Sequence, residues 1–193
     1  SIPAAGTRKQ REAGVVDDVA TMIADMERVA GPHDVPQLTR LLATRSAELV
    51  DWLVERCGVE VKLYTNYKHV GHSIPRLHTQ PGGRGIELIE SLARAAARAG
   101  IDIAYSNPVT RLLTDASGAV VGAEVRAGAA SHAIYAQKTV IATSGFGANR
   151  ALLREFCPEI AEALFFGAAG SEGDAIDWGR ALGAQLANIG AYQ

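Results

Sequence analysis

The feature that most constrains the fold is an apolar run that ends in a glycine-rich turn. Residues 138–143, which include Thr139-Val140-Ile141-Ala142, have the composition of a strand buried on both faces of a parallel sheet. The run enters Ser144-Gly145-Phe146-Gly147 and then a predicted helix over 150–156. This order predicts an α/β fold, a mixture of helix and strand. The turn lets a ligand approach the backbone, although a plain strand–helix connection explains the pattern equally well.

Hydrophobic spacing predicts the remaining elements. A helical period dominates the first third, where Trp52 is expected in the core, and after Gly100 the period falls towards two, which indicates a small β-meander. The expected helices are 15–29, about 34–57 with a break near 44–46, 86–99, 150–156 and 174–182. The expected strands are 60–64, 101–105, 109–114, 119–126, 132–137 and 138–143.

Composition excludes several classes of function. With 19 Lys and Arg against 21 Asp and Glu, the net charge of -2 gives no electrostatic case for binding nucleic acid or a membrane surface. No apolar run reaches the roughly 20 residues that a spanning helix needs. The two cysteines, Cys57 and Cys157, lack the spacing of a metal site, so we expect two buried thiols and no metal.

A loop over residues 67–85 is rich in basic side chains beside a predicted helix N-terminus, which favours an anion such as a carboxylate or phosphate. A solvated basic loop is the plainer interpretation. As a metal site it is weak, because His72 and His78 lie on a loop without a clear third ligand. The side chains concerned are His72, Arg76, His78 and Arg84.

A third motif is Gly170-Ser171-Glu172-Gly173-Asp174, which precedes the last predicted helix. The helix dipole alone explains an aspartate at this position, and a carboxylate presented to a polar cofactor group is the alternative. Ser144 is not in a G-x-S-x-G elbow, which excludes a serine hydrolase of that type. Neither GxGxxG nor a Walker loop occurs in the sequence.

In their order and spacing, these pieces resemble the flavoproteins of the fumarate reductase and succinate dehydrogenase family, in particular the single-subunit FAD-dependent dehydrogenases. The resemblance covers essentially the whole chain. The segments that carry it are Ile2–Arg8, Ser46–Leu53 with Trp52, Pro75–His78 with Gly82-Gly83, Val140–Phe146 and Gly170–Asp174.

The resemblance implies a partial FAD/NAD(P)-binding Rossmann-like domain with a β-meander and an N-terminal helical layer. It divides the chain into a helical segment (1–66), part of the FAD-binding domain (67–156) and the start of the substrate or cap-side region (157–193). The expected FAD contacts are Val109, Ala142, Thr143, Gly145 and Asp174.

The sequence departs from the family motifs at three positions. Ser144 replaces the first glycine of the A-T-G-G-[FY] motif, and Glu172 and Ala175 replace the threonine and the second glycine of T-G-D-G. A serine adds bulk where the backbone approaches a ligand. The family's GxGxxG, its substrate-binding histidine and its proton-donating arginine find no match here. We therefore expect an internal piece that by itself is inactive, binds FAD weakly or not at all, and self-associates.

For the intact protein, the resemblance implies hydride transfer between flavin N5 and a carbon–carbon bond of a carboxylate- or enone-type substrate. Fumarate reductases, tricarballylate dehydrogenase and 3-ketosteroid dehydrogenases are the relatives to consider. Arg76 and His78 would help to place an anionic small-molecule substrate, no catalytic residue is assigned within the chain, and a cytoplasmic, bacterial protein is expected. The alternative is a non-catalytic module that has lost FAD and binds an anion or a partner protein through residues 67–85.

Overall fold

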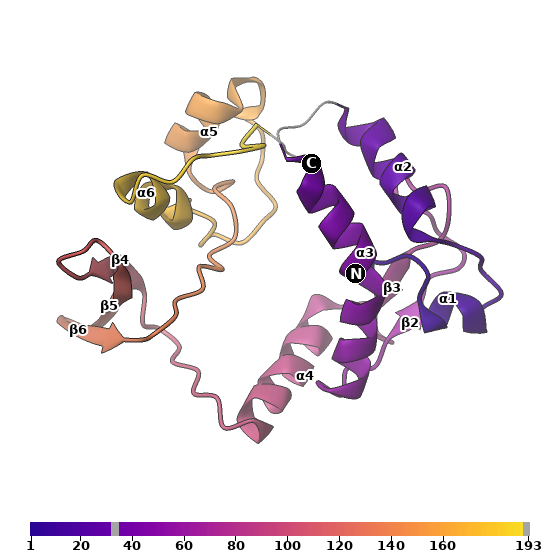
Figure 1. Ribbon diagram of the computed structural model, residues 1–193, viewed down its shortest axis with the longest axis horizontal. Helices are drawn as coiled ribbons and strands as arrows, with labels where there is room; N and C mark the ends of the chain where they lie inside the picture. The colour runs from indigo at the N-terminus through magenta and orange to yellow at the C-terminus, as the bar shows by residue number, and fades with distance from the viewer. Residues whose placement is uncertain (32–34, 191–193) are drawn as a thin grey trace. The chain divides into compact units, whose positions relative to one another are not determined.

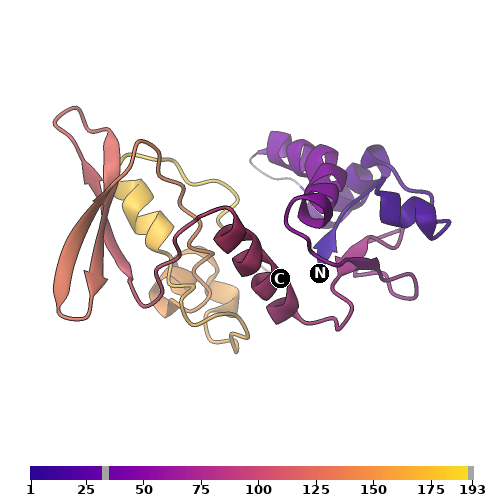
Figure 2. The same cartoon turned by 90° about the horizontal axis from the view of Figure 1, so that it is seen from below.

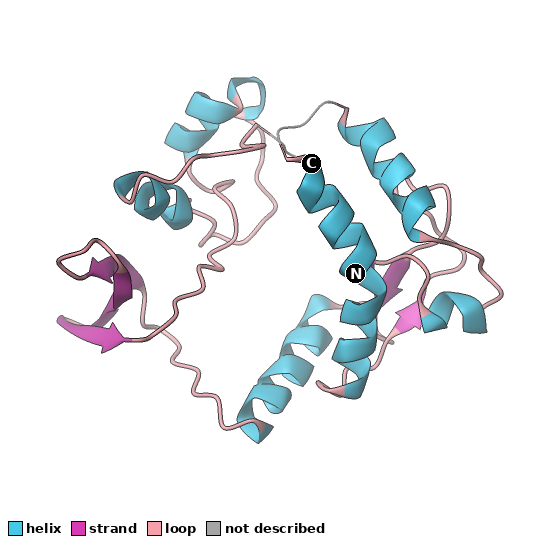
Figure 3. Ribbon diagram, viewed as in Figure 1, coloured by secondary structure: helices cyan, strands magenta, loops and turns pink. Residues whose placement is uncertain are grey.

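The computed structural model describes residues 1–31 and 35–190, and the chain divides into two compact units, residues 1–103 and 104–193. Figure 1 traces the chain through both units, and Figure 3 shows helices and strands in each, which confirms the predicted mixture. None of the described helices is long and apolar enough to cross a membrane.

The first unit combines a small sheet with four helices. Its three strands are antiparallel in the order β1-β3-β2, with Ile2 and Leu63 both opposite His78 of the central strand. Helices α2 and α3 pack against each other (Figure 1). The elements are β1 (Ile2–Pro3), α1 (Arg8–Glu12), α2 (Val19–Ala30), α3 (Pro36–Glu55), β2 (Lys62–Leu63), β3 (Leu77–Thr79) and α4 (Gly85–Arg98).

Two predictions for this unit are wrong. Helix α3 is continuous and lacks the break predicted near 44–46. The hydroxyl of Ser46 is compatible with the helix because it donates a hydrogen bond to the Ala43 carbonyl and accepts one from the Ala5 N–H. Trp52 is 51% exposed in this structure rather than in the core. Of the predicted start of this helix, Asp34 lies outside the described residues, and the helix begins at Pro36.

The second unit opens with the predicted meander. Its strands pair antiparallel in the order β4-β5-β6, and Figure 2 shows them as a twisted sheet of two hairpins. Two helices and a single 3₁₀ turn follow. The elements are β4 (Val109–Thr114), β5 (Val120–Ala127), β6 (Ala130–Tyr135), α5 (Arg150–Phe156), the 3₁₀ turn Pro158–Ile160 and α6 (Asp174–Ala181).

The strands predicted over 101–105 and 138–143 do not form. Both segments are irregular, and all of their residues except the half-buried Thr143 are exposed, with Val140 88% accessible to solvent. A strand exists only where its backbone N–H and C=O groups meet those of a neighbour, and the described residues supply no neighbour to either segment. The buried-strand composition of 138–143 therefore lacks its sheet within this chain.

Close approach of β5 and β6 depends on Gly122. A Cβ built at this position would overlap the carbonyl oxygen of Ile134, a backbone atom that cannot move without breaking the strand pair. We expect Gly122→Ala to destabilise the protein by about 1–3 kcal/mol, the usual range for overpacking. Chemical denaturation measures the change. The control is Gly85→Ala, where an added methyl meets open space and stability should hold; equal stability of the two variants would contradict the prediction.

Candidate functional site

The anion-binding residues predicted in the first unit lie in a buried polar network. Arg76 is fully buried, and its guanidinium binds Asp17 in a two-pronged ion pair, with Nε 2.7 Å from Oδ2 and Nη2 2.9 Å from Oδ1. Its Nη1 lies 2.5 Å from Oδ2 of Asp25. Two carboxylates thus neutralise the guanidinium inside the protein.

The same network satisfies the two carboxylates. Burial opposes the charged form of Asp25, but hydrogen bonds from the Ser73 N–H and hydroxyl and ion pairs with Arg76 and Arg28 outweigh it and hold the pKa of Asp25 well below its usual range. Gln10 donates to Asp17 Oδ2 at 2.8 Å and to the Pro75 carbonyl at 2.9 Å. The cluster therefore ties α1 and α2 to the segment that leads into β3, where Arg76 directly precedes the strand.

His78 belongs to this network as a neutral side chain. Its Nδ1 lies 2.8 Å from the Arg76 carbonyl and 3.3 Å from that of Ile2, so Nδ1 carries the hydrogen. Its Nε2 then accepts from the Thr7 hydroxyl at 2.8 Å. Burial lowers the pKa of His78, and the carbonyl contacts only partly offset this effect.

These contacts bear on the predicted anion site of residues 67–85. Every polar contact that the structure shows for Arg76 and His78 is with the protein itself, so their role in substrate binding stays a prediction. Arg84 is exposed and donates to Glu87 one helical turn away. The described residues therefore give Arg76, His78 and Arg84 separate partners. His72, the fourth basic side chain, differs from them, because its Nδ1 is buried and has no hydrogen-bond partner among the described residues.

Removal of the central cation tests the network. We expect Arg76→Met to lower the free energy of unfolding by about 3–5 kcal/mol, because it leaves two carboxylates buried without their cation. Arg84→Met is the matched control and should change stability by less than about 1 kcal/mol, as for other surface ion pairs. Denaturant titration of the full-length protein measures both. A loss for Arg76→Met no larger than that for the control would overturn the structural role.

The pKa shifts also predict how stability depends on pH. Folding lowers the pKa of His78, His72 and Asp25, so the unfolded chain binds more protons at all three and acid favours unfolding. Melting temperature should be level above pH 7, fall as pH drops below about 6.5, and fall again below about 4. His78→Gln should reduce the first step to the part that His72 contributes, and the exposed His132→Gln should leave it unchanged. A first step of full size in His78→Gln would contradict the assignment.

The second unit brings two predicted cofactor-binding segments together. Residues 142–145 and 171–174, hereafter the Gly145–Gly173 junction, are joined by a bond from the Gly173 N–H to the Gly145 carbonyl at 3.1 Å. Ala148 N–H donates to the Ser171 carbonyl at 2.9 Å, just beyond the first segment. Gly173 has a φ of 88°, and a Cβ there would overlap Leu152, so this close approach requires glycine.

Polar groups at the junction are only partly satisfied. The Thr143 hydroxyl is buried and has no hydrogen-bond partner among the described residues. A buried, unpaired hydroxyl costs about 1–3 kcal/mol, so such a group in a native fold calls for an explanation. Ser144 has a positive φ of 65°, and its hydroxyl accepts from that of Ser171 at 3.3 Å. The serine thus adopts the backbone conformation that glycine prefers.

Asp174 is the first residue of α6 and is half-buried. The N-cap, Gly173, contributes no side-chain hydrogen bond, so the first N–H groups of α6 have no side-chain cap. These N–H groups and the Thr143 hydroxyl are donors suited to a polar, negatively charged ligand. The junction therefore has donors of the kind that bind a polar, negatively charged ligand.

The structure brings four of the five predicted cofactor residues to the junction. Ala142, Thr143, Gly145 and Asp174 lie in its two segments. Val109 lies in β4 opposite Val125, and no hydrogen bond among the described residues joins that strand to the junction. All five roles stay predictions.

Asn149 lies just outside the junction and contacts it in a way that the sequence analysis missed. Its side-chain oxygen caps α5 by accepting from the N–H groups of Ala151 and Leu152, and its Nδ2 donates to the Glu172 carbonyl at 2.9 Å. An asparagine directly before a helix predicts an N-cap. The hydrogen bond to Glu172 joins residues 23 positions apart, so the local sequence could not have predicted it. Because Glu172 contributes its backbone here, the departure from threonine leaves this contact intact.

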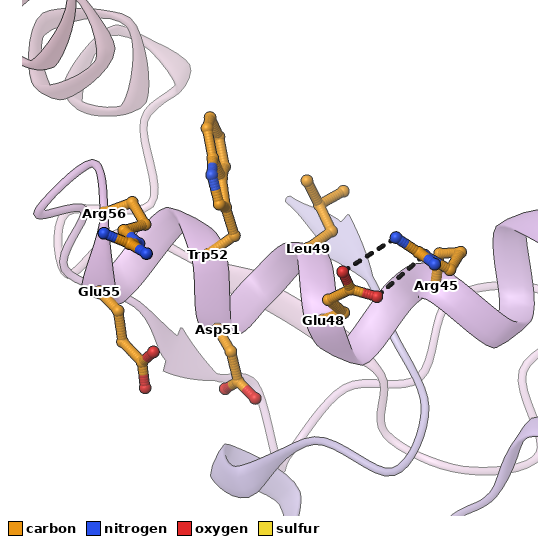
Figure 4. Close-up of a pocket in the computed structure, with 7 residues that line it drawn as sticks. All are labelled: Arg45, Glu48, Leu49, Asp51, Trp52, Glu55 and Arg56. Atoms are coloured by element: carbon orange, nitrogen blue, oxygen red, sulfur yellow. Dashed lines mark hydrogen bonds and ion pairs between the residues drawn. The ribbon is translucent and has the colours of Figure 1, made fainter. Parts of the chain in front are cut away.

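The pocket found on α3 does not make a better site. A shallow pocket on α3 is lined by residues of one helix and its end, among them Arg45, Glu48 and Trp52 (Figure 4). Figure 4 shows Arg45 and Glu48 bound to each other. All the lining residues come from α3 and its end, so no groups from other elements converge on the pocket.

Within residues 1–31 and 35–190, no cluster of three His, Cys, Asp or Glu could hold a metal ion. Both cysteines are buried free thiols, as predicted.

Comparison with known proteins agrees with this geometry. A family model described as an FAD binding domain matches residues 1–193. A probable fumarate reductase, Ifc3, of Shewanella frigidimarina is 30% identical over 96% of this chain and 32% of its own length. A urocanate reductase of Eggerthella lenta is 28% identical over 93% of this chain and 30% of its own length.

A solved structure shows the same fold. The open conformation of a flavocytochrome c3 fumarate reductase superposes with a TM-score of 0.90 and 28% identity, over 100% of this chain and 34% of that one. This chain therefore spans about a third of the length of each of these three proteins.

Proposed function

This chain belongs to the FAD-binding domain family, and from this membership we propose that the intact protein is an FAD-dependent oxidoreductase that transfers hydride to or from a carbon–carbon bond of a carboxylate substrate. The observation that carries the proposal is the Gly145–Gly173 junction, where an unpaired buried hydroxyl and an uncapped helix N-terminus lie on two hydrogen-bonded segments.

The residues of the junction fit the cofactor. The Thr143 hydroxyl would hydrogen-bond FAD, and the backbone of Ala142 and Gly145 would lie against the cofactor. Asp174 would accept hydrogen bonds from hydroxyl or ring N–H groups of FAD. When bound, FAD supplies the hydride donor or acceptor. The residues of this chain would orient FAD and hold the two segments of the junction in a fixed arrangement.

The substrate class follows from the names of the relatives. The two relatives described above are named for the reduction of fumarate and of urocanate, and both compounds carry a carboxylate conjugated to a carbon–carbon double bond. We propose the same class here, in preference to an enone, because both relatives are named for carboxylate compounds. The alkene of such a compound accepts hydride because the group beside it withdraws electrons. The groups that bind the carboxylate are proposed to lie outside this chain, since Arg76 and His78 are engaged with the protein itself.

Other parts of the intact protein are proposed to complete the fold. The apolar segment 138–143 would pair with strands contributed by sequence that this chain does not include. Residues 1–193 alone would then bind FAD weakly, lack activity and self-associate through that exposed segment. A cytoplasmic, bacterial setting likewise stays a prediction.

Asp174 and Asp177 provide a matched test. Both lie in the first turn of α6, but Asp174 is half-buried at the junction and Asp177 is exposed. We expect Asp174→Asn to weaken FAD binding by the full-length protein about ten-fold or more, as for loss of a hydrogen bond to a charged group, and Asp177→Asn to leave it unchanged. Fluorescence titration of the apoprotein with FAD measures both.

The same titration separates the proposal from its main alternative. Wild-type protein that takes up no FAD would reject the oxidoreductase and support a non-catalytic binding module. If wild-type protein binds FAD and both variants bind it equally well, the cofactor is held by groups other than Asp174.

A further inference from the structure

A loop beside the junction carries three large apolar side chains in succession. Leu164 and Phe166 extend into solvent, and Phe166 is 92% exposed, whereas Phe165 is 41% exposed because part of its ring packs against the protein. Phe165 and Phe166 are thus chemically identical neighbours in different environments.

Phe165 packs against two glycines. A Cβ built at Gly147 would lie closer than 3.0 Å to three atoms of the Phe165 ring, and the three atoms nearest to a Cβ at Gly167 also belong to that ring. Gly147 ends the glycine turn that leads from the junction to α5. The edge of the Phe165 ring therefore occupies the space where a Cβ at position 147 or 167 would lie.

The rest of the turn is fixed at three further points. The Gly145 carbonyl accepts from Gly173, and Phe146 packs in the core of this unit, with its ring centroid 5.7 Å from that of Phe156. The Asn149 N–H closes the turn by donating to the Phe146 carbonyl at 2.9 Å. Gly147 has no side chain of its own, and the atoms nearest to the position of its missing Cβ belong to the ring of Phe165.

The loop that carries Phe165 is itself anchored. Arg150, the first residue of α5, donates through Nη1 to the carbonyls of Ala161 and Ala163, the latter at 2.8 Å. The loop is thus tied to the helix that the glycine turn leads into. A ring held in this way can limit the motion of the turn.

We propose that Phe165 is a positioning residue that holds the glycine turn in the conformation that FAD binding requires, an inference that rests on the function proposed above. It acts through the backbone of Gly147 and does not itself contact the reacting atoms. Because binding weakens when the binding conformation is only partly populated, loss of the ring should lower affinity for FAD without removing any FAD contact.

The test compares Phe165→Ala with Phe166→Ala in the full-length protein. Hydrogen–deuterium exchange of the apoprotein should show amides 145–148 exchanging about ten-fold faster in Phe165→Ala, and the dissociation constant for FAD should rise about ten-fold. Phe166→Ala should match the wild type in both. Gly147→Ala, which forces the ring away from the turn, should weaken FAD binding as Phe165→Ala does.

The outcomes distinguish this inference from the proposed function. Wild-type protein that binds no FAD rejects both. If the wild type binds FAD, unchanged exchange or unchanged FAD affinity in Phe165→Ala rejects the role of Phe165 alone. Should Phe165→Ala fail to fold, Phe165→Leu keeps most of the apolar bulk; intermediate weakening of FAD binding supports the role, and wild-type affinity overturns it.

Discussion

The first unit depends on a buried guanidinium held between two carboxylates. Arg76 joins Asp17, two residues before α2, to Asp25 within that helix. Arg76 itself directly precedes β3, the central strand of the sheet. A single buried charge of either sign would be costly, so each member of the cluster requires the others. The hydrophobic clusters of this unit are small, and one of them has only three fully buried residues, Ala5, Met22 and Ala43. A polar network that fixes one geometry thus does part of the work of a larger apolar core.

In the second unit, backbone contacts rather than ion pairs hold the two segments of the Gly145–Gly173 junction together. The Gly145–Gly173 junction uses backbone hydrogen bonds and close contacts at glycines, and it carries no ion pair among the described residues. Backbone groups held in this way leave neighbouring donors free for a ligand. The ion pair between Arg180 and Glu155 joins α6 to α5. Neither residue belongs to the junction, so this ion pair holds the two helices together without occupying the junction's polar groups.

Local signals in the sequence predicted what local interactions decide. The α4 helix, the meander and α6 were predicted close to their observed bounds because their periodicity and turns lie within each segment. The strands β1 and β3 were missed, since two or three residues carry no periodicity and their pairing spans 76 positions between Ile2 and His78. The segment 138–143 was predicted as a strand from composition that suits a buried environment, but pairing depends on neighbours that the described residues do not provide. Trp52 was predicted in the core for the same reason: apolar character shows a preference for burial and does not say what covers the side chain.

The hydrogen bonds of buried polar groups show which residues hold the fold and where an added partner would stabilise it. Arg76 and His78 bind carboxylates, carbonyls and a hydroxyl of the protein, so both have a structural role, and their role in substrate binding stays a prediction. Two buried side-chain atoms among the described residues have no hydrogen-bond partner, the Nδ1 of His72 in the basic loop and the hydroxyl of Thr143 at the junction. Because an unpaired buried polar group is destabilising by itself, a ligand that hydrogen-bonded either atom would remove that cost. The sequence does not reveal such unpaired atoms, since hydrogen bonding depends on the neighbours that the fold brings close.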